Sequence, residues 1–368
     1  MFLNAVQYKC PYCGGELVFK PEQQKFGCDY CGSFFEEAEI AKMYEEVNKM
    51  AEESADPDVQ TIEDENDFAD IDDDNEFAEH TKLYTCDSCG AQIIADDTTA
   101  ASFCYYCHNP VVLAGRLSGK YKPKSVIPFA ITREKAEIGF KAWCKKKWFL
   151  PRDFKSKQQL EKMSGVYVPF WLTSCTANVD FSCIGEKKRH WTSGNYDITE
   201  VSEFAVKRKG EIPFERVPTD GASKIEDALM DAIEPYNYKE MRGFSMQYLS
   251  GFMAEKYDLD WEQVVSRAKE RINDGCKQKV HETLNGYSTT KAENMNVYYK
   301  KVDREYALMP VWFMTYQYKG KTYSFAMNAQ TGKLAGTPPL SIRRLLGFCA
   351  GLFAVIAVIV TIIGGMLS

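Results

Sequence analysis

The sequence predicts a multi-domain fold: two small β zinc ribbons, an α+β body with proline-led β-units, and one C-terminal transmembrane helix. Eight of the thirteen cysteines fall into four C-x2-C pairs, which are typical of metal sites in a reducing compartment. Helix and strand patterns alternate between residues 115 and 340, and the chain ends in an uncharged apolar run. The 368 residues exceed one ordinary domain, while 45% hydrophobic and 26% charged residues exclude a disordered or polytopic membrane chain.

The eight paired cysteines form two units with the same pattern. Each unit reads C-x2-C-x14-C-x2-C, and the second repeats the first at an offset of 76 residues. This spacing lets a β-hairpin carry the second pair back over the first, so that four thiolates surround one Zn²⁺ with no open position. Such a closed site is structural, because no water ligand remains for catalysis. The ligands predicted for two Zn²⁺ ions are Cys10, Cys13, Cys28, Cys31, Cys86, Cys89, Cys104 and Cys107.

The two zinc ribbons are expected at residues 1–35 and 81–112. His108 follows the last ligand and is predicted to be a bystander. The other cysteines lack ligand spacing, so we expect them to be small buried apolar residues. They are Cys144, Cys175, Cys183, Cys276 and Cys349.

Two further segments separate the ribbons. Residues 36–50 predict an amphipathic helix, because Ile40, Tyr44 and Val47 recur at helical spacing. Residues 51–80 predict an acidic disordered linker, which holds fourteen Asp or Glu and no Lys or Arg. Since the whole chain carries −7, the rest of the sequence carries +7. A docking peptide for a basic partner is the alternative for the acidic segment.

The body, residues 115–340, combines strands with helices. Val168-Pro169-Phe170-Trp171 and Met309-Pro310-Val311-Trp312 precede strand-like runs and look like two copies of a proline-led β-unit. The predicted strand-like runs are 172–184 and 313–328. Turns are predicted at 319–321 and 328–333, and helices at 132–148, 223–233 and 260–284.

A basic cluster with interleaved aromatic residues lies in the first of these helices and just beyond it. Basic and aromatic residues together are typical of an anionic membrane face or a nucleic-acid surface. A solvated helix face that packs its aromatic residues inward is the third alternative. A nearby membrane anchor favours contact with anionic headgroups over nucleic acid. The basic residues are Lys141, Lys145, Lys146, Lys147, Arg152, Lys155 and Lys157.

A transmembrane helix is predicted at residues 343–367. The 23 residues after Arg344 and before the final serine carry no charge, and thirteen of them are Leu, Ile, Val or Phe. A helix of that length measures roughly 35 Å and can cross a hydrocarbon core of about 30 Å. A buried core helix is the alternative. Arg343 and Arg344 flank the run, so the positive-inside rule keeps the preceding chain cytosolic. Gly347 and Gly351 would let two such helices pack closely as a homodimer.

The sequence lacks the short motifs of common enzymes. It contains no Walker phosphate loop, no G-x-G-x-x-G, no H-E-x-x-H and no G-x-S-x-G. His281-Glu282 has no second histidine at metalloprotease spacing. We therefore expect a protein that is not an enzyme.

The cysteine pairs at 8–35 and 84–110 resemble the zinc ribbon of transcription factor IIB (TFIIB). Together with the acidic segment, the two proline-containing strands, the turn at 328–333 and the terminal helix, they resemble a family of tail-anchored TFIIB-type zinc-ribbon membrane proteins, mostly from Gram-positive bacteria. Members of that family are often labelled as a primosomal replication-restart helicase, but the phosphate loop of a helicase motor is missing here. The resemblance implies recruitment of an SPFH (flotillin-like) partner to the membrane.

These observations favour a zinc-binding, membrane-anchored adaptor or scaffold that recruits a protein partner. The expected location is the plasma membrane, with a single span and the N-terminus and bulk of the chain in the cytosol. A membrane-tethered nucleic-acid-binding protein linked to replication or transcription is the alternative.

Overall fold

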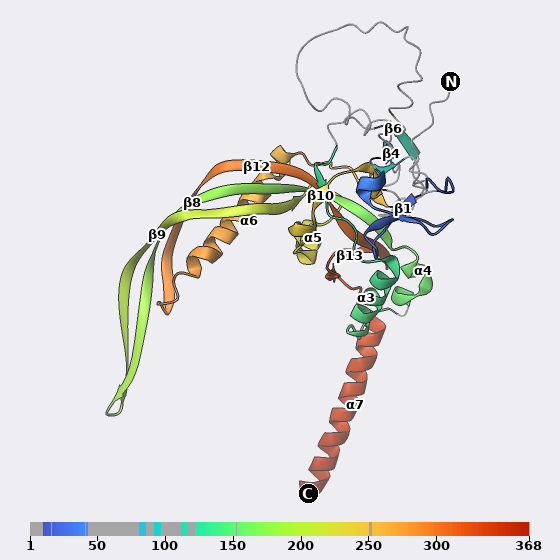
Figure 1. The fold of residues 1–368 in the computed structure, drawn as a ribbon. Coiled ribbons are helices and arrows are strands. Elements are labelled where there is room, and N and C mark those ends of the chain that lie inside the picture. Colours follow the sequence, from blue (N-terminus) through green and yellow to red (C-terminus); the bar gives the residue numbers. More distant parts are fainter. Residues whose placement is uncertain are drawn as a thin grey trace.

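A sheet-rich body, a long curved arm and one projecting helix make up the structure (Figure 1). The structure is a computed structural model, which describes residues 10–15, 17–40, 42, 81–85, 92–96, 112–116, 122–151, 153–249 and 252–367. The arm and the C-terminal helix α7 (Ile342–Leu367) both leave the body, whereas the N-terminal strands lie on the side of the body away from α7 (Figure 1). The predicted α+β class with one apolar C-terminal helix is therefore confirmed.

The first sheet is small and antiparallel. Its strands are β1 (Leu17–Lys20), β2 (Lys25–Cys28) and β3 (Phe34–Phe35). β1 and β2 pair from Leu17 and Cys28 to Lys20 and Lys25, across a tight turn that places Gln24 at a φ of 52°. Because side chains alternate along a strand, Leu17 and Phe19 both face inward, where each is 1% exposed.

A helical turn at residues 37–40 follows this sheet, and residue 42 is helical as well. The rest of the predicted helix at 36–50 and the acidic segment at 51–80 lie outside the described residues. Residues 10–40 are called the N-terminal cysteine unit below.

The second sheet has eleven strands and forms both the body and the arm. Its main order is β10-β7-β12-β8-β11-β5-β4-β6; in addition β9 pairs with β8, β13 pairs with β12, and β14 pairs with β13. The bounds are β4 (Thr81–Thr85), β5 (Gln92–Asp96), β6 (Val112–Arg116), β7 (Ser125–Val126), β8 (Ser164–Ser193), β9 (Tyr196–Asp220), β10 (Arg242–Gly243), β11 (Met253–Glu255), β12 (Thr289–Tyr318), β13 (Lys321–Asn328) and β14 (Leu334–Gly336).

The two proline-containing segments lie side by side at the centre of this sheet. Pro169 pairs with Leu308, two residues before Pro310. The prediction that these prolines lead their strands is wrong, because each lies inside a strand of 30 residues. Neither proline has an N–H to donate to the sheet. The carbonyls of Pro169 and Pro310 accept hydrogen bonds from the amides of Gly221 and Ala329 at 2.9 and 3.0 Å.

The arm consists of the outer parts of β8, β9 and β12 (Figure 1). β8 and β9 form a hairpin whose last pair is Ser193 and Tyr196. The helix α6 (Trp261–His281) lies along the concave side of the arm. Its core there comprises Cys175, Ala177, Val179, Phe181, Cys183, Val206, Ile272, Cys276, Val280 and Leu284. The arm curves so that its tip lies on the same side of the body as α7 (Figure 1).

The three predicted helices of the body are confirmed in outline. Thr132 caps α3 (Arg133–Lys145), and Asp260 with Gln263 forms a capping box at the start of α6. The third, α5 (Asp227–Ile233), begins later than predicted. Ser223 does not cap it, because its amide and hydroxyl both bond to the carboxylate of Asp258. Short helical segments are α4 (Lys157–Leu160) and the 3-10 turns Asp153–Lys155, Tyr238–Glu240 and Met246–Leu249.

Both predicted turns are confirmed. Lys319 and Gly320, with φ of 53° and 75°, join β12 to β13. In the turn at 328–333, the side-chain oxygen of Asn328 accepts hydrogen bonds from the amides of Gln330 and Thr331 at 2.9 and 3.0 Å.

Candidate metal centre and apolar helix

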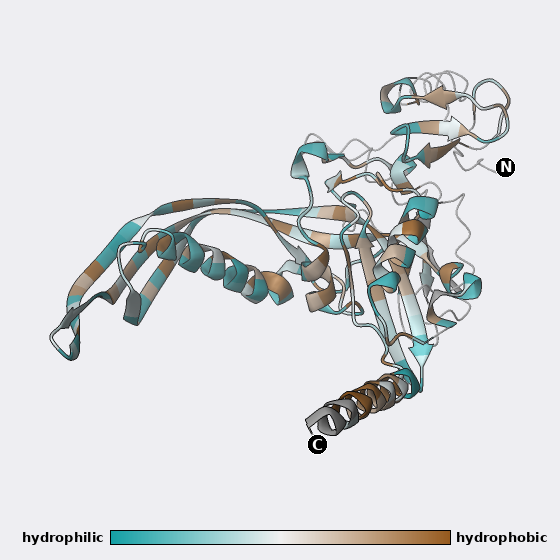
Figure 2. Cartoon of the chain, turned by 90° about the horizontal axis from the view of Figure 1, so that it is seen from below, coloured by the Kyte–Doolittle hydropathy of each residue, from teal (hydrophilic) through white to brown (hydrophobic). Residues whose placement is uncertain are grey.

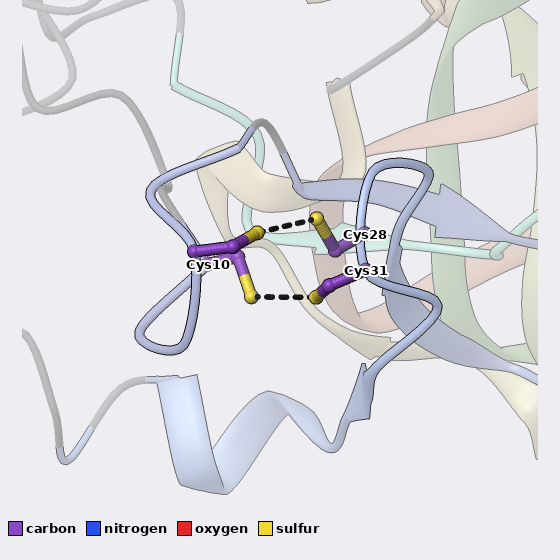
Figure 3. Close-up of side chains that lie close together, drawn as sticks. Cys10, Cys28 and Cys31 are labelled. Atoms are coloured by element: carbon purple, nitrogen blue, oxygen red, sulfur yellow. Dashed lines mark hydrogen bonds between the residues drawn. The ribbon is translucent and has the colours of Figure 1, made fainter.

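Four cysteines of the N-terminal cysteine unit meet at one point (Figure 3). Their sulfur atoms all lie within 4.8 Å of one another, with 3.4 Å between Cys10 and Cys31 and 3.5 Å between Cys13 and Cys28. Cys10 and Cys28 are buried, whereas Cys13 and Cys31 are exposed. Among the residues that the structure describes, this is the one group of His, Cys, Asp or Glu side chains arranged for a metal ion.

The two C-x2-C turns share one backbone design. In the first, the amide of Gly14 donates a hydrogen bond to the carbonyl of Cys10 at 2.8 Å, and in the second Gly32 donates to Cys28 at 2.9 Å. Both glycines have positive φ, 69° and 74°, which L side chains rarely adopt. A Cβ at Gly15 would lie 3.1 Å from the sulfur of Cys28, so this position also needs a small residue for the turns to approach each other.

The pKa values of the two exposed thiols, Cys13 and Cys31, shift in opposite directions. Hydrogen bonds to the side chain and backbone of Ser33 lower the pKa of Cys31 to about 6. A backbone hydrogen bond from Gly15 lowers the pKa of Cys13, but desolvation and the adjacent sulfurs outweigh it and raise that pKa to about 12. At Cys13 the adjacent sulfurs oppose ionisation, and a bound dication would favour the thiolate there.

The donor set fits a tetrahedral metal ion. Four thiolates about 2.3 Å from Zn²⁺ lie about 3.8 Å apart in a regular tetrahedron, close to the 3.4 and 3.5 Å between the paired sulfurs. Thiolates select soft or borderline metals over Mg²⁺ and Ca²⁺. The cluster of Cys10, Cys13, Cys28 and Cys31 could thus bind one metal ion, which would join the two turns and stabilise the unit.

The other four predicted ligands, Cys86, Cys89, Cys104 and Cys107, lie outside the described residues, as does His108. The strands around them are described. β4 ends one residue before Cys86, and β5 begins three residues after Cys89. An offset of 76 residues carries β1 onto the last four residues of β5, so the repeated cysteine pattern is accompanied by at least one repeated strand.

Aromatic side chains hold the N-terminal cysteine unit against the body. The buried ring of Tyr248 lies 5.4 Å from the ring of Phe19 and 5.8 Å from that of Phe26. Its hydroxyl donates a 2.6 Å hydrogen bond to Glu37. The sequence offers no local signal for this role, because Tyr248 lies in a short 3-10 turn more than 200 residues from its partners.

The remaining cysteines follow the prediction with one exception. Cys144, Cys175, Cys183 and Cys276 are buried, with exposed fractions of 5% or less. The prediction is wrong for Cys349, which is exposed on α7. Apolar surroundings for the Cys349 thiol would have to come from outside the described chain.

The predicted basic cluster gathers around the C-terminal end of α3, next to the start of α7. Trp143 packs inward, 5.5 Å from the ring of Phe325, whereas Trp148 is 71% exposed and lies 6.2 Å from Phe348 of α7. The exposed lysines are Lys141, Lys145, Lys146, Lys147 and Lys157. Arg152 and the side chain of Lys155 lie outside the described residues.

The helix α7 projects from the body, and no residue after Arg344 in it is charged (Figures 1 and 2). Its 26 residues measure about 39 Å, and the stretch Ile342–Thr361 is 0% buried. It is therefore not a core helix of the described chain and could span a membrane. Arg343 and Arg344 lie in its first turn, and the Arg344 guanidinium donates a 2.8 Å hydrogen bond to the carbonyl of Leu150. A Cβ at Gly347 or Gly351 would meet no atom within 4 Å.

The fold and site define an α+β protein with one four-cysteine metal cluster near its N-terminus and one C-terminal helix long and apolar enough to cross a membrane. Over 364 residues the chain is 32% identical to the uncharacterized protein YdjG of Bacillus subtilis (strain 168), an alignment that covers 98% of this chain and 99% of YdjG. The chain belongs to the same family as YdjG. No family model and no solved structure matches it.

Proposed function

We propose that the protein is a zinc-binding, tail-anchored adaptor, not an enzyme, which recruits a protein partner to the cytosolic face of the plasma membrane. The observation that carries the proposal is the placement of three features. The cysteine cluster lies on one side of the body, α7 leaves from the other, and the arm projects free of both (Figure 1). A cluster with four protein ligands has no open metal position, so it serves binding surfaces better than hydrolytic chemistry.

Zinc is the ion that we assign to both cysteine units, because a tetrahedral set of four thiolates is the usual structural zinc site. The first unit supplies Cys10, Cys13, Cys28 and Cys31. The second would use Cys86, Cys89, Cys104 and Cys107, which repeat the spacing of the first. With zinc in both units, the chain would match the TFIIB-type zinc-ribbon membrane proteins that its sequence resembles.

The orientation follows from charge. Arg343 and Arg344 precede the apolar run of α7. Positive residues stay on the cytosolic side of a membrane helix, so the body, the arm and both cysteine units would face the cytosol.

The arm is the surface that we propose for partner binding. Within the described sheet, β9 pairs with β8 alone, so its outer edge offers unpaired backbone groups to an added strand. Exposed apolar side chains accompany that edge, including Val201 at 47% and Phe204 at 43%. An SPFH-like protein is the first partner to test, as the resemblance of the sequence to the tail-anchored family implies.

Affinity capture of the full chain from mild detergent tests the adaptor role. A truncation of residues 1–110 would also remove β5 from the body sheet, where Ile93 is fully buried. Such a truncation would therefore disturb the body as well as the cysteine units. The sharper variants are Cys28→Ser, which removes one ligand, and Phe204→Asp, which places a charge beside the open edge. A buried thiol away from both the cluster and the arm, Cys144→Ser, is the matched control.

We expect one or more proteins to co-purify with the wild type and to be lost from the Phe204→Asp variant or the Cys28→Ser variant, but not from the control. An unchanged partner list in both variants would count against both surfaces. A wild-type chain that captures no protein from native membranes would overturn the adaptor proposal.

Membrane-tethered nucleic-acid binding remains the alternative proposal. The exposed lysines Lys141, Lys145 and Lys146 motivate it. They belong to α3 and its C-cap, and α3 lies next to the start of α7, which favours lipid (Figure 1). Phosphate contacts weaken steeply with salt. Salt-sensitive binding of an oligonucleotide by the full chain in detergent would support this alternative over the adaptor.

A further inference from the structure

A cavity lies where the body meets α7. Its volume is about 390 Å³, and it opens between the end of α3 and the segment that leads into α7. The lining residues are Lys146, Lys147, Trp148, Phe149, Leu150, Pro338, Pro339 and Leu340. One part of the wall is therefore cationic, and the rest is aromatic and aliphatic.

The wall of this cavity is fixed to the start of α7. The amide of Ser341 donates a 2.7 Å hydrogen bond to the carbonyl of Phe149, and the Arg344 guanidinium donates to the carbonyl of Leu150 at 2.8 Å. The ring of Phe149 lies edge-on to that of Phe348, 5.5 Å away. These contacts hold the cavity next to the first turns of α7.

The two charged residues that line the cavity, Lys146 and Lys147, are both cationic. Neither residues 138–152 nor residues 329–368 contain an Asp or a Glu. No carboxylate of the described residues pairs with Lys146 or Lys147, and the Lys147 ammonium lies 5.4 Å above the ring of Trp143. An anion at this site would meet cations with no competing carboxylate from these two segments.

From this arrangement we propose that the cavity binds one anionic phospholipid of the bilayer that α7 crosses. The phosphate of the headgroup lies against Lys146 and Lys147, and the acyl chains follow Trp148, Leu340 and the apolar surface of α7. This inference rests on the proposed membrane anchoring. It goes further by assigning a lipid class and a site, which fixes the height of the body above the membrane surface.

Three features of the site select a lipid over a free phosphate. Most of the lining is apolar, which suits glycerol and acyl carbons. The exposed Trp148 is of the residue type that gathers at membrane interfaces. The rings of Trp148 and Phe149, which line the cavity, lie against Phe348 of α7, so a lipid that follows α7 would meet the cavity.

The test uses the full chain in two stages. First, vesicle flotation shows whether the chain inserts into phosphatidylcholine vesicles. Second, native mass spectrometry of the detergent-solubilised chain, offered equal phosphatidylglycerol and phosphatidylcholine, measures which lipid stays bound. The variant is Lys146→Gln/Lys147→Gln. The charge-matched control is Lys20→Gln/Lys25→Gln, on the far side of the body (Figure 1).

We expect the wild type and the control to prefer phosphatidylglycerol, and the Lys146→Gln/Lys147→Gln variant to lose about 30-fold of that preference, from two lysines near the headgroup. Trp148→Ala should weaken retention of both lipids. Lys146, Lys147 and Trp148 are exposed, and Lys20 and Lys25 are half-buried lysines in surface ion pairs with Asp29 and Glu36. Because such surface positions contribute little to stability, the variants should change the melting temperature little, and it is measured alongside.

A chain that does not float with vesicles contradicts the anchoring proposal itself. A chain that floats but binds both lipids equally, or whose preference survives in the Lys146→Gln/Lys147→Gln variant, overturns the lipid site alone. Displacement of phosphatidylglycerol by excess inorganic phosphate would show a phosphate site instead. Displacement by an oligonucleotide would assign the lysines to nucleic acid.

Discussion

The ring of Tyr248 lies edge-on to that of Phe19, with 5.4 Å between the centroids, and this contact joins the N-terminal cysteine unit to the body. Both rings are 1% exposed or less. The metal cluster is consequently attached to the body through a buried aromatic contact and does not depend on its flanking chain alone.

Tyr248→Ala should release the N-terminal cysteine unit from the body. Truncating a buried aromatic side chain costs about 3–5 kcal/mol. Tyr248→Phe removes only the two hydrogen bonds of the hydroxyl, which donates to Glu37 and accepts from Arg242, each worth about 1 kcal/mol. Limited proteolysis of the full chain should show much faster cleavage between the unit and the body in the alanine variant. Tyr298→Ala, at a position that is 65% exposed, is the control and should cleave like wild type.

The contact at Tyr248 also shows where prediction from the sequence ends. The cysteine spacing was sufficient to predict the cluster of Cys10, Cys13, Cys28 and Cys31, because the chemistry of the site is encoded within 22 residues. Helical periodicity and caps were sufficient for α3 and α6, since those signals are local. No local pattern could pair Tyr248 with Phe19.

The sequence did not predict the arm either, because its length also depends on contacts between distant segments. Strands of 30 residues are far longer than the usual five or six, and polar residues on β9 hide its alternation. The length is supported by cross-strand pairs between β8, β9 and β12 and by α6, none of which is visible in one segment alone. Proline also misled the prediction, because Pro169 lies within β8 and does not begin it.

Substitution of one ligand should remove one metal ion. If each cysteine unit binds zinc, the wild type holds two equivalents, and Cys28→Ser should hold one, because three thiolates bind far more weakly than four. Cys144→Ser, which alters a buried thiol away from the cluster, should keep both. Elemental analysis of the purified full chain measures the ratio. An unchanged zinc content in Cys28→Ser would contradict the assignment of Cys10, Cys13, Cys28 and Cys31.

A buried ion pair at the base of the arm should be necessary for stability. The carboxylate of Asp220 is fully buried at the end of β9 and pairs with Arg267 of α6, which also bonds Asp231 at 2.6 Å. Arg267→Ala would leave Asp220 buried without its cation, at a cost of about 3–5 kcal/mol. Arg304→Ala, which breaks an exposed pair with Glu262, is the control and should cost less than about 1 kcal/mol. Thermal unfolding in detergent compares the stability of the two variants. Equal losses of stability would contradict the larger contribution that we propose for the buried pair.

The same carboxylate predicts a pH dependence. Desolvation raises the pKa of Asp220 from 3.8 to about 6, against the opposing effect of Arg267. A folded-state pKa above the unfolded value means that the contribution to stability is complete below about pH 4 and is lost as the pH rises through about 6. Relative to Asp220→Asn, the wild type should lose on the order of 3 kcal/mol over that interval. Parallel stability curves for the two proteins between pH 4 and pH 7 would argue against this shift.

Membrane insertion should fail only when the charge lies near the middle of α7. The thirteen Leu, Ile, Val and Phe side chains of the predicted span favour insertion by roughly 4–8 kcal/mol, and each central arginine costs about 2.5–3.5 kcal/mol. One arginine therefore leaves a net preference for the membrane, whereas Ile356→Arg/Ile359→Arg cancels most of it and should shift the chain to the aqueous fraction. Leu340→Arg/Ile342→Arg adds the same charge beside Arg343, where it remains in the interface, and should stay with the membrane. Alkaline extraction of membranes followed by immunoblotting separates these outcomes. Equal retention of both double variants would contradict the predicted cost of the two central charges. Release of the wild type by alkali would mean that the chain is held by a peripheral surface and that α7 does not cross the bilayer.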